Sequence, residues 1–115
     1  MEKILLEETR FPDDIVRDLS IIKSILLRYG ARKIIVYGSV ARGDYRVDSD
    51  IDVCCEGIPP EYYFRALAEC MMATRKHVSV LDFASLQGYF KERIVREGKI
   101  LYEHNRAAEG DRVRA

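Results

Sequence analysis

The sequence predicts an α/β (α+β) domain with one mixed β-sheet of about four strands and helices packed mainly on one face. Three observations predict this class. Short β-branched runs alternate with longer segments of helical periodicity, the 115 residues suffice for one hydrophobic core, and 48% of them are hydrophobic. The second face of such a sheet remains available for a functional site.

The first half of the chain is expected to contain a long helix followed by two strands. Apolar residues recur at spacings of three and four over residues 13–29, which predicts an amphipathic helix. KIIVYG, residues 33–38, is β-branched and predicts a buried strand. SVARGDY, residues 39–45, is expected to form a short helix or turn, and DIDVCCEG, residues 50–57, a second strand.

The second half of the chain is expected to contain two helices and two strands. A helix is predicted to begin at the Pro59-Pro60 pair, and a third strand covers residues 77–83. A third long helix is predicted over residues 85–98, and KILYE, residues 99–103, is the fourth strand. The apolar positions expected to share a face are Tyr63, Leu67, Cys70 and Met71 in one helix, and Leu86, Phe90 and Ile94 in the other.

Composition and charge exclude several classes of protein. The 19 basic and 19 acidic residues cancel, so no global field attracts nucleic acid, and general nucleic-acid binding is not expected. The apolar runs are too short to cross a membrane, so no membrane association is expected. The N-terminus MEKILLEETR is acidic where a signal peptide is basic, which indicates a cytoplasmic protein. We interpret residues 1–104 as the domain and the polar residues 105–115 as a frayed tail.

The three cysteines, Cys54, Cys55 and Cys70, lack the spacing of a metal motif. Cys54 and Cys55 are adjacent in a predicted strand, so their side chains should point to opposite faces of the sheet. We therefore expect small buried side chains in a reducing compartment rather than a shared metal site.

Two acidic residues form the first part of a candidate site. Asp50 and Asp52 lie two apart at the start of the second predicted strand, so they should share a face with Cβ atoms roughly 6 to 7 Å apart. Two carboxylates at that separation can bind Mg²⁺, which commonly takes one or two carboxylates plus phosphate oxygens. Two solvated carboxylates would give the same pattern, so this pair alone is weak evidence.

The segment upstream supplies the second part of the candidate site. Gly38 and Ser39 leave a strand and enter a turn, where backbone N–H groups and the serine hydroxyl can bind phosphate. Arg42 follows three residues later and could bind phosphate or pair with carboxylates. A phosphate-binding turn beside two carboxylates is the arrangement that nucleotidyl transfer from a magnesium-bound nucleotide requires.

The residues GSVARGDYRVDSDID resemble the signature of nucleotidyltransferases of the DNA polymerase beta superfamily. The size of the chain and its ARGD and SDID segments resemble the minimal nucleotidyltransferase (MNT) group, over residues 12–103. The resemblance implies that Gly38 and Ser39 hold the triphosphate of ATP, the substrate, while Asp50 and Asp52 bind Mg²⁺. It also implies a partner, since MNT proteins typically pair with a HEPN toxin and act as antitoxins that transfer AMP to a tyrosine of that toxin.

The third predicted strand departs from the family pattern. Complete members supply a third carboxylate there, and Ser79 occupies the equivalent position. Asp82 is three residues away and should face the opposite side unless a bulge redirects it. His77 shares the face of Ser79 and could act as a base or be merely packed. Two further acids in neighbouring loops are possible ligands, Glu56 and Asp48.

Three functions therefore stay open, the third of them minor. The first is a nucleotidyltransferase that moves AMP, or another nucleoside monophosphate, onto a hydroxyl of a partner protein. The second is an antitoxin that acts by contact alone, with Ser79 as a trace of lost catalysis. A third, lesser reading is an accessory subunit of a larger transferase. Either antitoxin would form an assembly with its partner, and the candidate contact residues are Tyr62, Tyr63, Tyr89 and Tyr102.

Overall fold

The computed structural model describes residues 11–46 and 48–104, in which four strands form one mixed sheet. Residues 1–10 and the predicted tail, residues 105–115, lie outside the described residues. The sheet order is β3-β2-β1-β4, with β1 antiparallel to β2 and β4, and β2 parallel to β3. The strands are β1 (Lys33–Tyr37), β2 (Ile51–Glu56), β3 (Val78–Asp82) and β4 (Lys99–Glu103).

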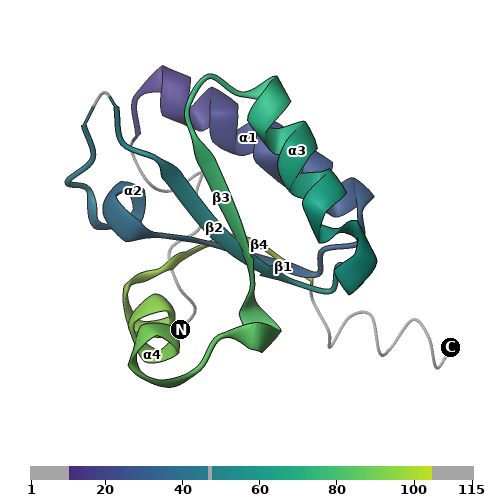
Figure 1. Ribbon diagram of the computed structural model, residues 1–115. Helices are drawn as coiled ribbons and strands as arrows, with labels where there is room; N and C mark the ends of the chain where they lie inside the picture. Colours follow the sequence, from purple (N-terminus) through teal and green to yellow (C-terminus); the bar gives the residue numbers. More distant parts are fainter. Residues whose placement is uncertain (1–10, 47, 105–115) are drawn as a thin grey trace, which may run out of the picture.

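The two longest helices of the described chain cover one face of this sheet, side by side (Figure 1). The fourth helix lies on the opposite side of the sheet, and a short second helix follows β1 directly. The predicted fold class is confirmed, with the qualification that one helix covers part of the second face. The elements are α1 (Asp13–Arg28), α2 (Gly38–Arg42), α3 (Tyr63–Ala73) and α4 (Gly88–Glu97), with 3₁₀ turns η2 (Pro60–Tyr62) and η3 (Phe83–Ser85).

The main hydrophobic core lies between the sheet and the pair α1 and α3. Alternate strand residues point into it, because successive side chains of a strand project to opposite faces. Burying one aliphatic side chain of this kind stabilises the fold by about 1.5 to 3 kcal/mol. Fully buried members include Leu19, Ile22 and Leu26 of α1, Ile34 and Val36 of β1, Val53 of β2 and Cys70 of α3.

A second, smaller cluster lies on the other face. Ile35 of β1 and Cys54 of β2 are buried there against Ile94 of α4. This cluster is small because α4 is the one helix of the described residues that packs on this face. The rest of the face is therefore free to carry polar residues.

The start of α4 differs from the sequence prediction. The helix begins at Gly88 rather than near Ser85, because the preceding residues form the turn η3. The Asp82 carboxylate accepts a hydrogen bond from the Ala84 backbone N–H at 3.1 Å, and this bond stabilises the turn. Leu86 consequently has extended backbone and reaches the smaller cluster from outside the helix.

The structure confirms that the cysteines are buried, with Cys54 and Cys55 on opposite faces of the sheet. Cys55 lies in the main core and Cys54 in the smaller cluster on the opposite face, and all three thiols are free and buried. Burial raises the pKa of Cys54 and Cys70 to about 12 and that of Cys55 to about 11, so all three stay protonated.

No helix in the described part of the chain is long and apolar enough to span a membrane.

Candidate functional site

The turn from β1 into α2 lies against the carboxylate of Asp52. Gly38 has φ +75°, a left-handed conformation that glycine adopts readily, and a Cβ at this position would lie 2.5 Å from Oδ2 of Asp52. Ser39 follows in the first turn of α2, which no side chain of the described residues caps. The backbone N–H groups of this turn therefore remain available to an anion. The structure thus brings the predicted phosphate turn and one predicted metal ligand together.

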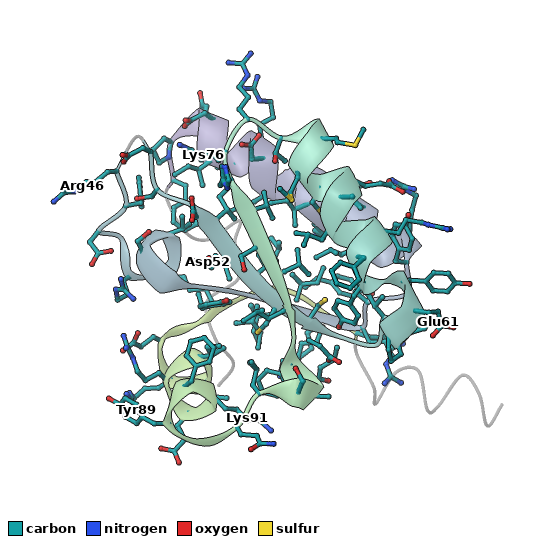
Figure 2. The ribbon with its side chains drawn as sticks, in the orientation of Figure 1. Arg46, Asp52, Glu61, Lys76, Tyr89 and Lys91 are labelled. Atoms are coloured by element: carbon teal, nitrogen blue, oxygen red, sulfur yellow. The ribbon has the colours of Figure 1, made fainter. Side chains whose placement is uncertain are left out.

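Asp52 is the middle member of a row of three side chains across the sheet. It pairs with Tyr37 of β1 in antiparallel register and with Ser79 of β3 in parallel register. Side chains in register point to the same face, which here is the face away from α1 and α3. Figure 2 shows Asp52 in the region between α2 and β3. The third position of this row holds a hydroxyl rather than a carboxylate.

The surroundings of Asp52 disfavour its charged form relative to a fully solvated carboxylate, so the pKa of Asp52 is raised. Partial burial raises the pKa of Asp52, and the nearby Asp50 charge raises it further, while Arg42 acts in the opposite direction. Asp50 is exposed and lies one residue before β2, where the sequence predicted the first residue of the strand. The two carboxylates are therefore close enough to repel each other, and a bound cation would relieve that repulsion.

Arg42 is engaged by carboxylates. Its Nε lies 3.3 Å from Oδ2 of Asp44, and its other end lies 3.9 Å from Oε1 of Glu97 on α4. Its side chain remains 40% exposed, so these contacts are solvent-accessible and each is weak. Phosphate binding by Arg42 would replace one or both contacts.

Two aromatic residues extend the site toward α4. Burial raises the pKa of Tyr37 to about 12, with a smaller contribution from Asp52, while a hydrogen bond with Ser79 opposes the shift. Tyr37 therefore stays a neutral phenol at physiological pH. Its ring meets Phe90 of α4 edge to face at 5.9 Å. Sequence reasoning missed Tyr37, because its place beside Asp52 depends on the register in which β1 pairs with β2.

The other acids and the histidine considered from the sequence lie apart from Asp52. Asp82 is in register with Cys55, on the opposite face, as strand alternation predicts. His77 is exposed and precedes β3. Glu56 lies at the other end of β2, four residues or about 13 Å from Asp52. Asp48 is exposed in the loop before the strand.

The donor set fits Mg²⁺ in one particular way. Across residues 11–46 and 48–104, no group of three or more His, Cys, Asp or Glu side chains could hold a metal ion. Two carboxylates, one of them held against the phosphate turn, suit a cation that also takes oxygens from a substrate phosphate. Asp50 and Asp52 therefore fit Mg²⁺ that arrives with a nucleotide, rather than a resident ion held by protein alone.

Of the four tyrosines considered as partner contacts, two are open to solvent. Tyr62 is 40% exposed and Tyr89 is 67% exposed. Tyr63 and Tyr102 are partly buried and pack against the main core. Tyr89 projects from α4 into solvent (Figure 2).

Two sequence comparisons identify relatives of the chain. The family model described as "Polymerase beta, Nucleotidyltransferase" matches residues 20–107, most of the 115 residues. A protein of Methanocaldococcus jannaschii named "Putative protein adenylyltransferase" is 29% identical over 69 residues, which are 60% of this chain and 53% of the relative. The match thus spans about half the length of that relative.

Solved structures share the fold. A chain of a toxin–antitoxin complex with AMP-PNP is 20% identical, with a TM-score of 0.67 over 79% of this chain and 77% of its own. A structure described as a "putative minimal nucleotidyltransferase" is 25% identical, with a TM-score of 0.63 over 73% and 89%. A complex of tri-AMPylated Shewanella oneidensis HEPN toxin with MNT antitoxin gives 17% identity and a TM-score of 0.62 over 82% and 76%.

Proposed function

Since this chain belongs to the Polymerase beta nucleotidyltransferase family, we propose that it transfers AMP from ATP to a hydroxyl group of a partner protein. Two comparisons support the choice of AMP and of a protein acceptor. The Methanocaldococcus jannaschii relative is named as a protein adenylyltransferase, and one complex of the same fold contains an AMPylated toxin beside its antitoxin. The proposed partner is a HEPN-type toxin, and the chain would act as its antitoxin in the cytoplasm.

One observation carries this proposal. The Asp52 carboxylate lies so close to the Gly38 backbone that a methyl group at Gly38 would meet Oδ2 at 2.5 Å. A phosphate on the backbone N–H groups of this turn would therefore lie next to the carboxylates that hold a metal ion. Nucleotidyl transfer depends mainly on such positioning and charge neutralisation.

Each residue of the site has a proposed role. The backbone at Gly38 and the Ser39 hydroxyl hold the triphosphate, and Arg42 adds positive charge when it leaves its carboxylate partners. Asp50 and Asp52 hold Mg²⁺, which when bound would neutralise phosphate charge and favour pyrophosphate departure. The acceptor oxygen attacks the α-phosphorus, the bond to pyrophosphate breaks, and the hydroxyl proton passes to solvent.

Label transfer tests the proposal. Incubation with α-labelled ATP, Mg²⁺ and the HEPN-type partner should label the partner, and the double variant Asp50→Ala/Asp52→Ala should lower the rate by about 1000-fold. The matched control is Glu61→Ala, which removes an exposed carboxylate at η2, away from the site (Figure 2). Absence of label with the wild-type chain, or full activity in the double variant, would rule out the proposed transfer.

A second function is favoured by the residue beside Asp52. Ser79 stands in register with Asp52, at the position where the family resemblance implies a third carboxylate. An antitoxin that neutralises its toxin by contact alone would need no acid there. Toxin neutralisation in cells separates the two functions: the double Asp variant should lose it if transfer is required and keep it if contact suffices.

A further inference from the structure

Phe90 of α4 is a partly exposed aromatic side chain that contacts Tyr37, next to the candidate site. Phe90 is in the first turn of α4, where the sequence predicts a core position, yet 47% of its surface is exposed. Its ring meets Tyr37 at an interplanar angle of 82°. An edge-to-face contact uses the edge of one ring and one face of the other, so it leaves at least one face of the Phe90 ring for a second, parallel partner.

The position of Phe90 relative to Asp52 suggests what that partner is. Tyr37 directly precedes Gly38 and is in register with Asp52, so their Cα atoms lie about 5 Å apart. The ring centroids of Phe90 and Tyr37 lie 5.9 Å apart. A nucleotide whose phosphates bind at Gly38 and whose nucleoside extends toward α4 would bring its base to the rings of Tyr37 and Phe90.

The surroundings of this pair favour a flat apolar group. Ile35, Leu81 and Leu86 belong to the small cluster under α4, as does Tyr37 itself. Aromatic side chains bind nucleobases by stacking, which contributes about 1 to 3 kcal/mol per base and tolerates any base because each has a π face. Purines present the larger surface and should stack more strongly than pyrimidines.

We propose that Phe90, supported edge to face by Tyr37, is the stacking platform for the base of the bound nucleotide. The inference rests on the proposed function, since the phosphates must be held at Gly38 for the base to reach α4. It assigns α4 a role in nucleotide selection. Phosphate and metal binding use the β1–α2 turn and β2, whereas base binding uses α4.

A tryptophan at this position provides a direct readout, because the natural chain contains none. In the Phe90→Trp variant, MgATP and MgGTP should quench the indole fluorescence on binding, with MgUTP quenching less. Magnesium tripolyphosphate, which lacks a base, should bind without that quenching. Equal fluorescence changes with tripolyphosphate and ATP would contradict the inference that residue 90 stacks on the base.

Affinity measurements on three substitutions separate stacking from packing. Phe90→Ala and Phe90→Leu should both weaken MgATP binding by about 5- to 150-fold, while Phe90→Tyr retains it. Binding of magnesium tripolyphosphate should stay within about twofold in all three. The control is Tyr89→Ala, which removes the neighbouring aromatic ring, 67% exposed, and should leave both affinities unchanged.

Each of the following outcomes would overturn the inference. Unchanged ATP affinity in Phe90→Leu would mean that the ring only covers the small cluster. Parallel losses of ATP and tripolyphosphate affinity in Phe90→Leu, with unchanged circular dichroism, would mean that Phe90 supports the phosphate turn rather than the base. If the wild-type chain binds tripolyphosphate, and the Phe90 variants bind ATP as tightly as wild type does, only the base-stacking inference fails. If the wild-type chain binds neither ligand, both the base-stacking inference and the proposed function fail.

Discussion

The two faces of the sheet are built from alternate residues of the same strands, yet they differ in almost every physical property. On the face under α1 and α3, Val53 is fully buried. Its neighbour Asp52 points to the other face, where it is only partly buried and stands between Tyr37 and Ser79. We refer to these as the closed face and the open face.

The difference shows how a small domain can carry a charged site without losing stability. The closed face supplies most of the apolar burial, since it receives both long helices (Figure 1). Among the described elements α4 covers the open face only in part, and Asp52 there keeps some contact with solvent. A repelling pair such as Asp50 and Asp52 is tolerable there, because water screens it.

The largest change in unfolding free energy should come from placing a carboxylate on the closed face instead of the open face. Val53→Asp would place an unpaired carboxylate in the closed face and should destabilise the chain by about 4 kcal/mol, enough to unfold much of it. The reciprocal variant Asp52→Val should leave stability unchanged or slightly improved, because a β-branched residue suits a strand. Urea unfolding followed by circular dichroism measures both. Equal destabilisation by the two variants would contradict the distinction between the faces.

The next effect tests the contact between the phosphate turn and Asp52. Gly38→Ala should cost about 1 to 2 kcal/mol for its positive φ and also displace the Asp52 carboxylate, weakening MgATP binding. Gly43→Ala is the matched control, because Gly43 has φ +88° but a Cβ there meets nothing within 4 Å. Both variants should lower the unfolding free energy.

Calorimetry then distinguishes the two glycines. Only Gly38→Ala should lower the MgATP affinity of the folded fraction. Equal affinities in the two variants would indicate that the short approach between Gly38 and Asp52 has no role in nucleotide binding.

A third carboxylate on the open face should strengthen the site. Ser79→Asp places a charge in register with Asp52, so Mg²⁺ affinity in the presence of ATP should rise by about tenfold. Ser79→Asn has the same shape without the charge and should give no gain. Titration with Mg²⁺ measures the change. If label transfer rises in parallel, Ser79 limits turnover; if only affinity rises, the serine affects metal binding alone.

Much of the closed face was predictable from the sequence, and less of the open face. Helical spacing in residues 13–29 and the β-branched strands identify the buried positions, because burial imposes a period on the chain. The alternation rule also correctly placed Asp82 away from Ser79. The proximity of Gly38 to Asp52 follows from strand pairing, which the sequence suggested only through the family resemblance.

The features that the sequence did not predict depend on contacts between segments distant in the chain. Phe90 has the spacing of a core residue in α4, but its exposure depends on how α4 sits over Tyr37. Met71 was likewise expected on the buried face of α3 and is 46% exposed. For Arg42 the sequence left phosphate binding and pairing with carboxylates both open, and Glu97 could not be named as a partner because that contact arises only when α2 and α4 meet.

The smallest effect concerns a carboxylate at the rim of the closed face, whose electrostatics are opposite to those of Asp52. Glu69 of α3 accepts hydrogen bonds from the Tyr29 hydroxyl and, at 2.9 Å, from Arg28 of α1. These bonds, from Tyr29 first and then Arg28, lower the pKa of Glu69 below its ordinary value of 4.5. The charged form is therefore favoured by folding, whereas for Asp52 burial and Asp50 disfavour it.

The sign of the resulting pH dependence follows from linkage. A lowered pKa in the folded state stabilises the chain above the unfolded-state pKa, and this stabilisation is lost as the pH falls through the folded-state value. Glu69→Gln should therefore be slightly less stable than wild type near neutral pH, with the difference vanishing under acid and shrinking in high salt. Glu61→Gln, an exposed acid without an ion pair among the described residues, should show no such difference. A gap between wild type and Glu69→Gln that persists at low pH would show that the side chain stabilises the α1–α3 contact by packing rather than by its charge.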